Sequence, residues 1–297
     1  MTMKKSSLKI TLLIVLLVSM IFPSCKKNDG KSTNENAETL TVNGVAREYI
    51  RYIPFSYDGS NDVPLMLNFH GFGMTATNQM NIADMRSLAD LENFILVYPQ
   101  GTLLDGSPHW NSGLDTPDNK SDAEDLDFIE ALIDELSSNY SIDLERVYAC
   151  GYSNGSFFSY ALGCYLSHKI AAIGSVSGTM MEETLNNCNP THPTAMINLH
   201  GTSDNTVLYN GGEGLEAIDD VMNYWANYNN TNTTPVTNTE NNIEYFSYNN
   251  GTAGVSVEHY KINGGEHVWF DIDYQGSNTN QLIWNFVSQY DINGLIQ

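Results

Sequence analysis

The chain has 297 residues, which is enough for one enzyme-sized domain with a large core. Its composition is that of a folded protein, with 41% hydrophobic and 11% aromatic residues, and its formal net charge is −22. Nucleic acids and anionic membrane surfaces repel so acidic a protein, which argues against both as partners.

The first residues are typical of an export signal. Several lysines stand before an apolar run at residues 10–21, which is too short for a membrane span and fits a signal peptide. Ser24 directly before Cys25 resembles the cleavage box of bacterial lipoproteins, in which the cysteine is lipidated. The alternative is an ordinary signal peptide with an incidental cysteine. The sequence predicts a lipoprotein signal over residues 1–24, and a protein that is secreted and lipid-anchored at the bacterial cell envelope, on the outer membrane or the cell surface.

The segment that follows is polar and lacks periodicity, so residues 25–38 are predicted to be the lipidated cysteine and a flexible tether, and residues 39–297 the catalytic domain. Three more cysteines lie in that domain. Cys150 ends an apolar, strand-like run and is expected to be buried. Cys164 and Cys188 are therefore the favoured disulfide in an oxidising compartment.

From residue 40 onwards, apolar runs alternate with helix-like patterns. Residues 40–56 alternate apolar and polar side chains around Asn43-Gly44, which predicts a β-hairpin. The other predicted strands, each a short apolar run, are 64–71, 94–101, 146–151, 170–178, 195–201, 243–248 and 255–262. The predicted helices are 78–92, one that a Ser121–Glu124 capping box opens, 154–166, 214–228 and 279–290; residues 229–242 are predicted to be a loop.

Strands that alternate with helices predict an α/β fold with a mostly parallel sheet covered on both faces. In such sheets the chemistry lies at the carboxyl ends of the strands. The sequence Gly151-Tyr152-Ser153-Asn154-Gly155 falls at one of these ends, between a predicted strand and a predicted helix. This G-x-S-x-G pattern is typical of a sharp turn that presents a nucleophilic serine, here Ser153. The alternative is that Ser153 only caps the helix.

A nucleophilic serine needs a base, and seven histidines are available. In this fold the base follows the acid along the chain, which leaves His200, His259 and His267. His259 alternates within a strand, and His200 would have its acid on the wrong side in sequence. His267, in a glycine-rich loop after the last strand, is the predicted base. Asp204, just past a strand end and between Ser153 and His267, is the predicted acid.

Acyl transfer also needs hydrogen-bond donors for the developing oxyanion. The backbone N–H of Asn154, directly after the nucleophile, is one predicted donor. The loop His70-Gly71-Phe72-Gly73 follows an early strand and is a histidine–glycine motif of the expected kind, so the N–H of Phe72 is the second. The side chain of His70 is expected to brace this loop.

At these residues the sequence resembles a known family, the secreted polyhydroxybutyrate depolymerases and feruloyl esterases of the α/β-hydrolases, related to carbohydrate esterase family 1. The resemblance extends over roughly residues 40–295. The stretches that carry it are NFHGFG, HWNSG, AEDLDFIEALID, RVYACGYSNGSFFSYALGC, INLHGTSDNTVLYNGG and GGEHVW. It implies an α/β-hydrolase fold with a central sheet of about eight strands, no metal and no organic cofactor. It also implies Ser153 as nucleophile, Asp204 as acid and His267 as base.

The resemblance extends to the expected mouth of the site. Trp110 and Asn111 resemble the family's tryptophan–asparagine pair, and Trp269 is expected nearby. These aromatic rings would either stack on a sugar or phenolic acyl group, or only wedge loops together. Two departures are Ser156, where glycine or alanine is usual, and Glu266, where a third glycine is usual.

The sequence therefore predicts a serine carboxylesterase that acts on a carbohydrate-linked or oligomeric ester, with feruloyl or acetyl groups on plant polysaccharide fragments favoured. A polyhydroxybutyrate depolymerase is the alternative. A serine peptidase and a non-catalytic binding lipoprotein are the rival classes, because a fold alone does not fix function.

Overall fold

The structure, a computed structural model, describes residues 37–114 and 119–297. These residues belong to one compact unit. The predicted signal peptide, the lipidation site Cys25 and most of the predicted tether lie outside the described residues.

The described chain begins with the predicted β-hairpin. Strands β1 (Ala37–Val42) and β2 (Val45–Tyr52) pair antiparallel on either side of a two-residue turn. Asn43 and Gly44 both have positive φ, at 50° and 82°, which the tightest hairpin turns require and which these two residue types tolerate best. The first two residues of β1 come from the segment predicted to be tether.

The hairpin forms one edge of a ten-stranded sheet, in the order β1-β2-β4-β3-β7-β8-β9-β12-β11-β10. The remaining strands of this sheet are β3 (Val63–Phe69), β4 (Ile95–Pro99), β7 (Ile142–Tyr152), β8 (Ala172–Val176), β9 (Ala195–Gly201), β10 (Val236–Glu240), β11 (Ile243–Tyr248) and β12 (Val257–Ile262). The six central strands from β4 to β12 are parallel, and the strands at both edges are antiparallel. The α/β class is confirmed, and antiparallel edge strands bring the sheet to ten strands, where the resemblance implied about eight.

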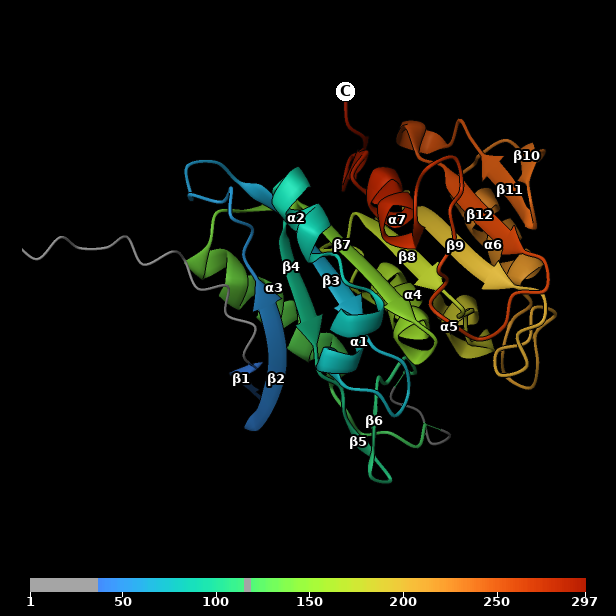
Figure 1. Ribbon diagram of the computed structural model, residues 1–297. Helices are drawn as coiled ribbons and strands as arrows, with labels where there is room; N and C mark the ends of the chain where they lie inside the picture. Colours follow the sequence, from blue (N-terminus) through green and yellow to red (C-terminus); the bar gives the residue numbers. More distant parts are fainter. Residues whose placement is uncertain (1–36, 115–118) are drawn as a thin grey trace, which may run out of the picture. The chain divides into compact units, whose positions relative to one another are not determined.

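Helices cover both faces of this sheet (Figure 1). One core cluster holds side chains of α3 (Asp125–Asn139), α4 (Asn154–Tyr165) and α6 (Ile218–Tyr228). The other holds side chains of α1 (Ala76–Ile82), α2 (Arg86–Glu92) and α7 (Thr279–Val287). The elements outside these layers are the hairpin β5 (Thr102–Leu104) and β6 (Ser107–His109), the helices α5 (Glu182–Asn187) and η1 (Thr252–Gly254), and the pair β13 (Tyr290–Asp291) and β14 (Gly294–Leu295).

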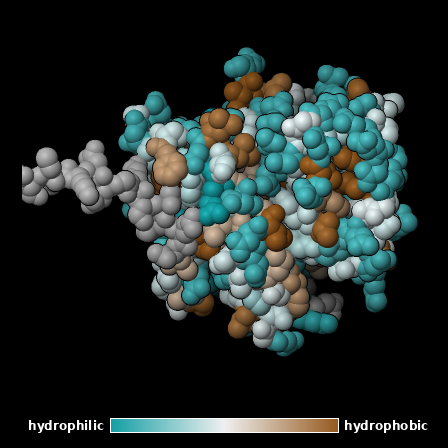
Figure 2. Space-filling model, in the orientation of Figure 1, coloured by the Kyte–Doolittle hydropathy of each residue, from teal (hydrophilic) through white to brown (hydrophobic). Residues whose placement is uncertain are grey.

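The face of the molecule in Figure 2 is largely hydrophilic, with hydrophobic residues in small separate groups. Among residues 37–114 and 119–297, no helix has both the length and the apolar character needed to cross a membrane.

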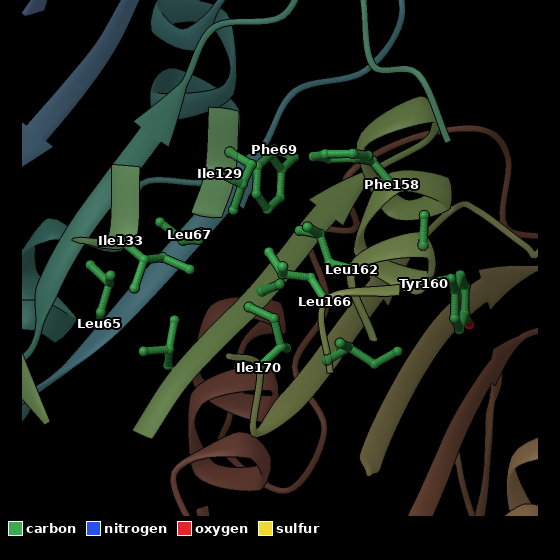
Figure 3. Close-up of a cluster of buried hydrophobic side chains, with 14 of the residues drawn as sticks. Leu65, Leu67, Phe69, Ile129, Ile133, Phe158, Tyr160, Leu162, Leu166 and Ile170 are labelled. Atoms are coloured by element: carbon green, nitrogen blue, oxygen red, sulfur yellow. The ribbon is translucent and has the colours of Figure 1, made fainter. Parts of the chain in front are cut away.

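The central strands are apolar on both faces because helices cover both. All seven residues of β3 and all five of β4 are buried. Figure 3 shows how Leu65, Leu67 and Phe69 of β3 lie beside Ile129 and Ile133 of α3, with Phe158 and Leu162 of α4 in the same cluster. Deeply buried strands of this kind fix the positions of the loops at their carboxyl ends, where the candidate site lies.

Two helix predictions were wrong in detail. The predicted helix 78–92 is interrupted between α1 and α2, where the Tyr98 hydroxyl donates to the Ala83 carbonyl (2.8 Å) and accepts from the Met85 N–H (3.2 Å). The predicted capping box does not form, because α3 begins at Asp125 and Glu124 caps it without a side-chain hydrogen bond. The Ser121 hydroxyl bonds instead to His109 Nε2, at 2.6 Å.

A disulfide joins Cys164, at the end of α4, to Cys188, which directly follows α5. This is the pair that the sequence favoured. Cys150 is fully buried in β7 and has a free thiol, and burial raises its thiol pKa.

Candidate active site

Ser153 lies on a sharp elbow between β7 and α4. Its φ and ψ are 53° and −119°, a conformation that costs free energy for a residue with a side chain. The surrounding backbone maintains it: the Ser153 N–H donates to the Val176 carbonyl (3.0 Å), and the Ser153 carbonyl accepts from the N–H groups of Ser156 (2.9 Å) and Phe157 (3.1 Å). The side chain therefore stands above the carboxyl ends of the strands.

The two glycines of the motif are needed because the elbow is crowded. A Cβ atom on Gly151 would lie 2.3 Å from the Gly155 carbonyl oxygen, and one on Gly155 would lie 2.3 Å from the Phe69 carbonyl oxygen. No side chain fits at such distances without moving backbone. Ser156, the departure from the usual small residue, is fully buried and forms a hydrogen bond with the Ser175 hydroxyl.

The three predicted catalytic side chains lie in one hydrogen-bonded row. His267 Nε2 is 2.9 Å from Ser153 Oγ, and His267 Nδ1 is 2.7 Å from Asp204 Oδ2. A carboxylate only accepts hydrogen bonds, so we assign the proton to Nδ1, which leaves Nε2 free to accept from the serine hydroxyl. The residues come from three different strand ends, and 18% of the His267 side chain is exposed, so a substrate can reach the row.

Asp204 is held as a carboxylate. Its side chain is fully buried, which by itself raises the pKa, but hydrogen bonds from His267, Val207 and Thr206 outweigh burial and lower the pKa below its ordinary value. Both N–H groups donate to Oδ1, at 2.8 Å each, while Oδ2 faces His267. The carboxylate thus orients the imidazole and would stabilise its positive charge.

His200, which the sequence left as a weaker candidate base, lies behind the acid. Its Nε2 donates to the Val207 carbonyl (2.9 Å) and is 3.5 Å from Asp204 Oδ2. Burial lowers its pKa, so it is neutral at pH 7 and packs beside Asp204 without pairing with it as an ion. His259 is also buried and bonds to the Tyr209 hydroxyl at 2.9 Å, in agreement with a structural role.

The predicted oxyanion donors, the N–H groups of Phe72 and Asn154, form no hydrogen bond within the described part of the chain. The loop that carries Phe72 is braced by His70, as expected. His70 Nε2 accepts from the Gly101 N–H (2.9 Å) and Nδ1 lies 2.8 Å from the Gly71 carbonyl oxygen. Burial lowers the pKa of His70 to about 4, so the ring is neutral and can accept at one nitrogen while it donates at the other.

The aromatic rings predicted at the mouth pack against neighbouring residues, which favours the second alternative, that they wedge loops together. The Trp110 ring is 2% exposed and packs between Phe69 and Phe158, with its ring parallel to that of Phe158 within 10°, so it wedges the core and is not open for stacking. Trp269 is half-buried, and its indole N–H donates to Asn280 Oδ1 (3.1 Å). The sequence could not distinguish these packed rings from exposed ones.

A cavity of about 650 Å³ lies beside the predicted oxyanion donors. Phe72 and Asn154 belong to its wall, as do Trp110 and Asn111, whereas Trp269 does not. The rest of the wall is formed by Leu104, His109, Ser112, Gly113, Asn119, Lys120, Ser121, Phe157, Met181, Glu183 and Leu215. The Asn111 amide is occupied by neighbouring loops, since Nδ2 donates to the Ala123 carbonyl and Oδ1 accepts from Asn119, each at 3.0 Å.

One functional contact had no signal in the sequence. The Asn154 side chain binds both backbone groups of Trp110: Oδ1 accepts from its N–H (2.7 Å) and Nδ2 donates to its carbonyl (3.0 Å). Asn154 thereby fixes part of the cavity wall. The two partners are 44 positions apart, so only the folded chain reveals the pairing.

Ser153 lies at an elbow between a strand and a helix, Asp204 follows a later strand, and His267 follows a strand after that. This order along the chain is typical of the α/β-hydrolase fold. The chain belongs to the phospholipase/carboxylesterase family, whose model matches residues 59–223. The resemblance to this group of α/β-hydrolases is confirmed.

The chain is 30% identical to feruloyl esterase B of Piromyces equi over 258 residues, which are 83% of this chain and 46% of that protein. It is 28% identical over 253 residues to a bifunctional acetylxylan esterase/xylanase of Neocallimastix patriciarum, covering 84% of this chain and 34% of that protein. The chain thus spans less than half the length of both relatives. An acetyl xylan esterase from Aspergillus awamori is similar in fold, with a TM-score of 0.64 and 15% identity over 85% of this chain and 99% of that chain.

Proposed function

We propose that this protein hydrolyses carboxylic esters through an acyl-serine intermediate on Ser153. The observation that carries the proposal is the unbroken row from Ser153 Oγ to His267 (2.9 Å) and from His267 to Asp204 (2.7 Å). The backbone N–H groups of Phe72 and Asn154, which bond to no other group of the described residues, are the predicted oxyanion donors. The proposal agrees with the family and with curated relatives that are named esterases.

The chemistry follows from the proton positions. His267 Nε2 takes the proton of Ser153 as Oγ bonds to the ester carbonyl carbon. The carbonyl oxygen becomes an oxyanion, which the N–H groups of Asn154 and Phe72 stabilise. His267 then gives the proton to the leaving alcohol as the carbon–oxygen bond breaks. Water, deprotonated by the same histidine, attacks the acyl-serine and releases the acid, which restores Ser153.

We propose feruloyl or acetyl esters of plant polysaccharide fragments as the substrate class. Support comes from the relatives named feruloyl esterase and acetylxylan esterase. The cavity of about 650 Å³ is large for an acetyl group and within the usual range for aromatic ligands, and Leu104, Phe157 and Met181 give it apolar walls. An aromatic acyl group is therefore the favoured occupant, with acetyl second and a hydroxybutyrate polyester as the alternative.

A serine peptidase remains the rival enzyme, because the same row of side chains can cleave amides. It would cleave peptide anilides, which an esterase would leave intact. A binding lipoprotein would cleave neither anilides nor esters. The proposed location, a lipid anchor on Cys25 in the cell envelope, would be tested by mass spectrometry of the N-terminal peptide from cell membranes; an unmodified Cys25 there would contradict it.

The proposed function is tested by hydrolysis of a short substrate panel. The panel holds 4-nitrophenyl acetate, methyl ferulate, acetylated xylan, a hydroxybutyrate oligomer and a peptide anilide. We expect the highest kcat/KM on methyl ferulate or acetylated xylan. Preference for the hydroxybutyrate oligomer would support the polyester alternative, activity on the anilide alone would support the peptidase, and no turnover of any substrate would contradict an enzyme.

A further inference from the structure

The loop that carries the base is held by hydroxyl groups from two other strands. We call residues 263–269, which follow β12, the histidine loop. The Tyr152 hydroxyl donates to the His267 backbone carbonyl at 2.9 Å. The Ser177 hydroxyl donates to the next carbonyl, that of Val268, at 2.7 Å. Two consecutive peptide groups at the base are therefore fixed by side chains about 115 and 91 positions away in sequence.

The same two strand ends also hold the nucleophile. Tyr152 directly precedes Ser153, and Ser177 directly follows Val176, whose carbonyl accepts from the Ser153 N–H at 3.0 Å. The ends of β7 and β8 thus bind the serine through backbone and the histidine loop through side chains. Any shift of one strand end would move the nucleophile and the base together.

The conformation of Ser177 costs free energy and is nevertheless maintained. Its φ is 49°, in the left-handed region that glycine favours, and the residue is fully buried. Its N–H donates to the Leu199 carbonyl at 3.0 Å. A glycine would suit this backbone better, but only a side chain with a donor can reach the Val268 carbonyl. Ser177 thus occupies a backbone conformation that residues with a side chain disfavour.

Tyr152 contacts the base with its ring as well as its hydroxyl. The ring centroids of Tyr152 and His267 are 5.1 Å apart with an interplanar angle of 36°. Burial, with a smaller contribution from Asp204, raises the pKa of Tyr152 to about 12, so the hydroxyl remains a donor. When His267 takes the serine proton it becomes a cation, and an aromatic ring at this distance attracts a cation.

The opposite end of the histidine loop is attached elsewhere. The Gly264 N–H donates to Thr202 Oγ1, and the Gly265 carbonyl accepts from the Ser203 N–H, both at 2.9 Å. These bonds to the end of β9 precede His267 in the chain. Without the hydroxyl groups of Tyr152 and Ser177, the backbone carbonyls of His267 and Val268 would lose these two side-chain hydrogen bonds, and the His267 ring could move relative to Ser153.

We propose that Tyr152 and Ser177 are positioning residues that hold the His267 backbone so that Nε2 stays within hydrogen-bond distance of Ser153 Oγ. The inference rests on the proposed function and deepens it, since it names what keeps nucleophile and base together. If the two residues had only a structural role, their loss would lower the stability of the fold and leave unchanged the rate at which Ser153 reacts.

The test compares Tyr152→Phe, Ser177→Ala and Ser177→Gly with wild type in the full chain. The measured quantities are kcat and KM on 4-nitrophenyl acetate, the rate of inactivation by a fluorophosphonate, and Tm. The matched control is Tyr224→Phe, which also removes one hydroxyl that donates to a backbone carbonyl, that of Cys188 (3.0 Å), away from the triad.

We expect each change at Tyr152 or Ser177 to lower kcat and the inactivation rate about 10-fold, because each removes one hydrogen bond that positions His267. KM should stay within about twofold of the wild-type value. Ser177→Gly separates an effect on stability from an effect on positioning, because it relieves the cost of the positive φ while it removes the hydroxyl that binds the Val268 carbonyl. It should therefore be at least as stable as Ser177→Ala and equally slow. Proton NMR should also show broadening of the far-downfield Nδ1–H signal of His267 in Tyr152→Phe and not in Tyr224→Phe.

Three outcomes would overturn the inference. Variants at Tyr152 and Ser177 that keep kcat and the inactivation rate within twofold of an active wild type would overturn it and leave the proposed function intact. A Tyr224→Phe variant that loses as much activity would assign the effect to general loss of stability. A wild type that neither hydrolyses esters nor reacts with the fluorophosphonate would overturn the proposed function and this inference together.

Discussion

Asp204 is held in place by hydrogen bonds at both of its carboxylate oxygens. Two of these bonds come from backbone N–H groups and one from His267, and the pKa of Asp204 is lowered despite burial. The neighbouring His200 is neutral and donates to a backbone carbonyl, so it cannot replace the acid as an acceptor for His267.

Asp204→Asn should therefore lower kcat by about 10³–10⁴-fold, because an amide can donate to Nδ1 and favour the wrong tautomer of the imidazole. The measurement is kcat on 4-nitrophenyl acetate, with circular dichroism to check the fold. Asp220→Asn, an exposed carboxylate on α6, is the matched control and should retain full activity. An active Asp204→Asn variant would mean that another group orients the base.

At this scale the sequence predicts a residue well when local chain geometry determines its place. Ser153, Asp204 and His267 were recognisable because an elbow motif and two strand ends follow each other in a required order. Trp110 was not, because its burial depends on Phe69 and Phe158, which reach it only in the folded chain. Tyr152 and Ser177 likewise act through carbonyls more than 90 positions away.

At the scale of elements, the elbow depends on the close approach of β3, β7 and α4. Gly155→Ala should lower the free energy of unfolding by about 2–4 kcal/mol, because its Cβ would lie 2.3 Å from the Phe69 carbonyl oxygen. Urea denaturation measures this. Gly212→Ala is the control, since nothing lies within 4 Å of a Cβ there. Equal free energies of unfolding for the two variants would contradict the claim that the elbow has no room for a side chain at Gly155.

The disulfide joins α4 to the end of α5 across a sequence separation of 24. Restricting a loop of this length in the unfolded chain is worth about 3 kcal/mol, so Cys164→Ala/Cys188→Ala should lower Tm by roughly 10 °C. Activity at 25 °C should remain, because neither cysteine belongs to the predicted triad or to the cavity wall. Calorimetry and the esterase assay together check this prediction. An unchanged Tm would indicate that the bond does not form in the protein.

Elements with a strong apolar pattern were predicted well, and polar edge elements were not. The fully buried strands β4, β8 and β9 fall within the predicted ranges, and β3 begins one residue before its predicted range, at Val63. Strand β10 was taken for a loop because an edge strand with an exposed, polar sequence has no apolar face to reveal it. The β5–β6 hairpin, which was not predicted, turns at Asp105-Gly106, and both residues have positive φ, as in a typical two-residue hairpin turn.

At the scale of the whole molecule, buried histidines link stability to pH. Burial lowers the pKa of His70 to about 4 and that of His259 to about 3, whereas an unfolded histidine has a pKa of about 6.5. Between these values the unfolded chain binds more protons than the folded chain. Stability is therefore fully present above about pH 6.5 and is lost as the pH falls towards 4, by up to about 1.4 kcal/mol per pH unit for each histidine.

Tm should accordingly fall between pH 7 and pH 5 in wild type. Burial also lowers the pKa of His200, which acts in the same direction, whereas burial raises the pKa of Glu258, which acts in the opposite direction and reduces the slope. His259→Gln should flatten the dependence, and the exposed His168→Gln should not. A Tm that does not vary over this range in wild type would contradict the neutral, buried state of these rings.

The central claim is that Ser153 is the nucleophile of an ester hydrolase. The most direct test treats wild type, Ser153→Ala and Ser137→Ala with a fluorophosphonate, followed by intact-mass measurement, peptide mapping and an ester assay. We expect one adduct on Ser153 in wild type and in Ser137→Ala, and the adduct should abolish the esterase activity of both. Ser153→Ala should form no adduct and should have no activity before or after treatment. An adduct on another residue, or a Ser153→Ala variant that hydrolyses esters as fast as wild type, would contradict it.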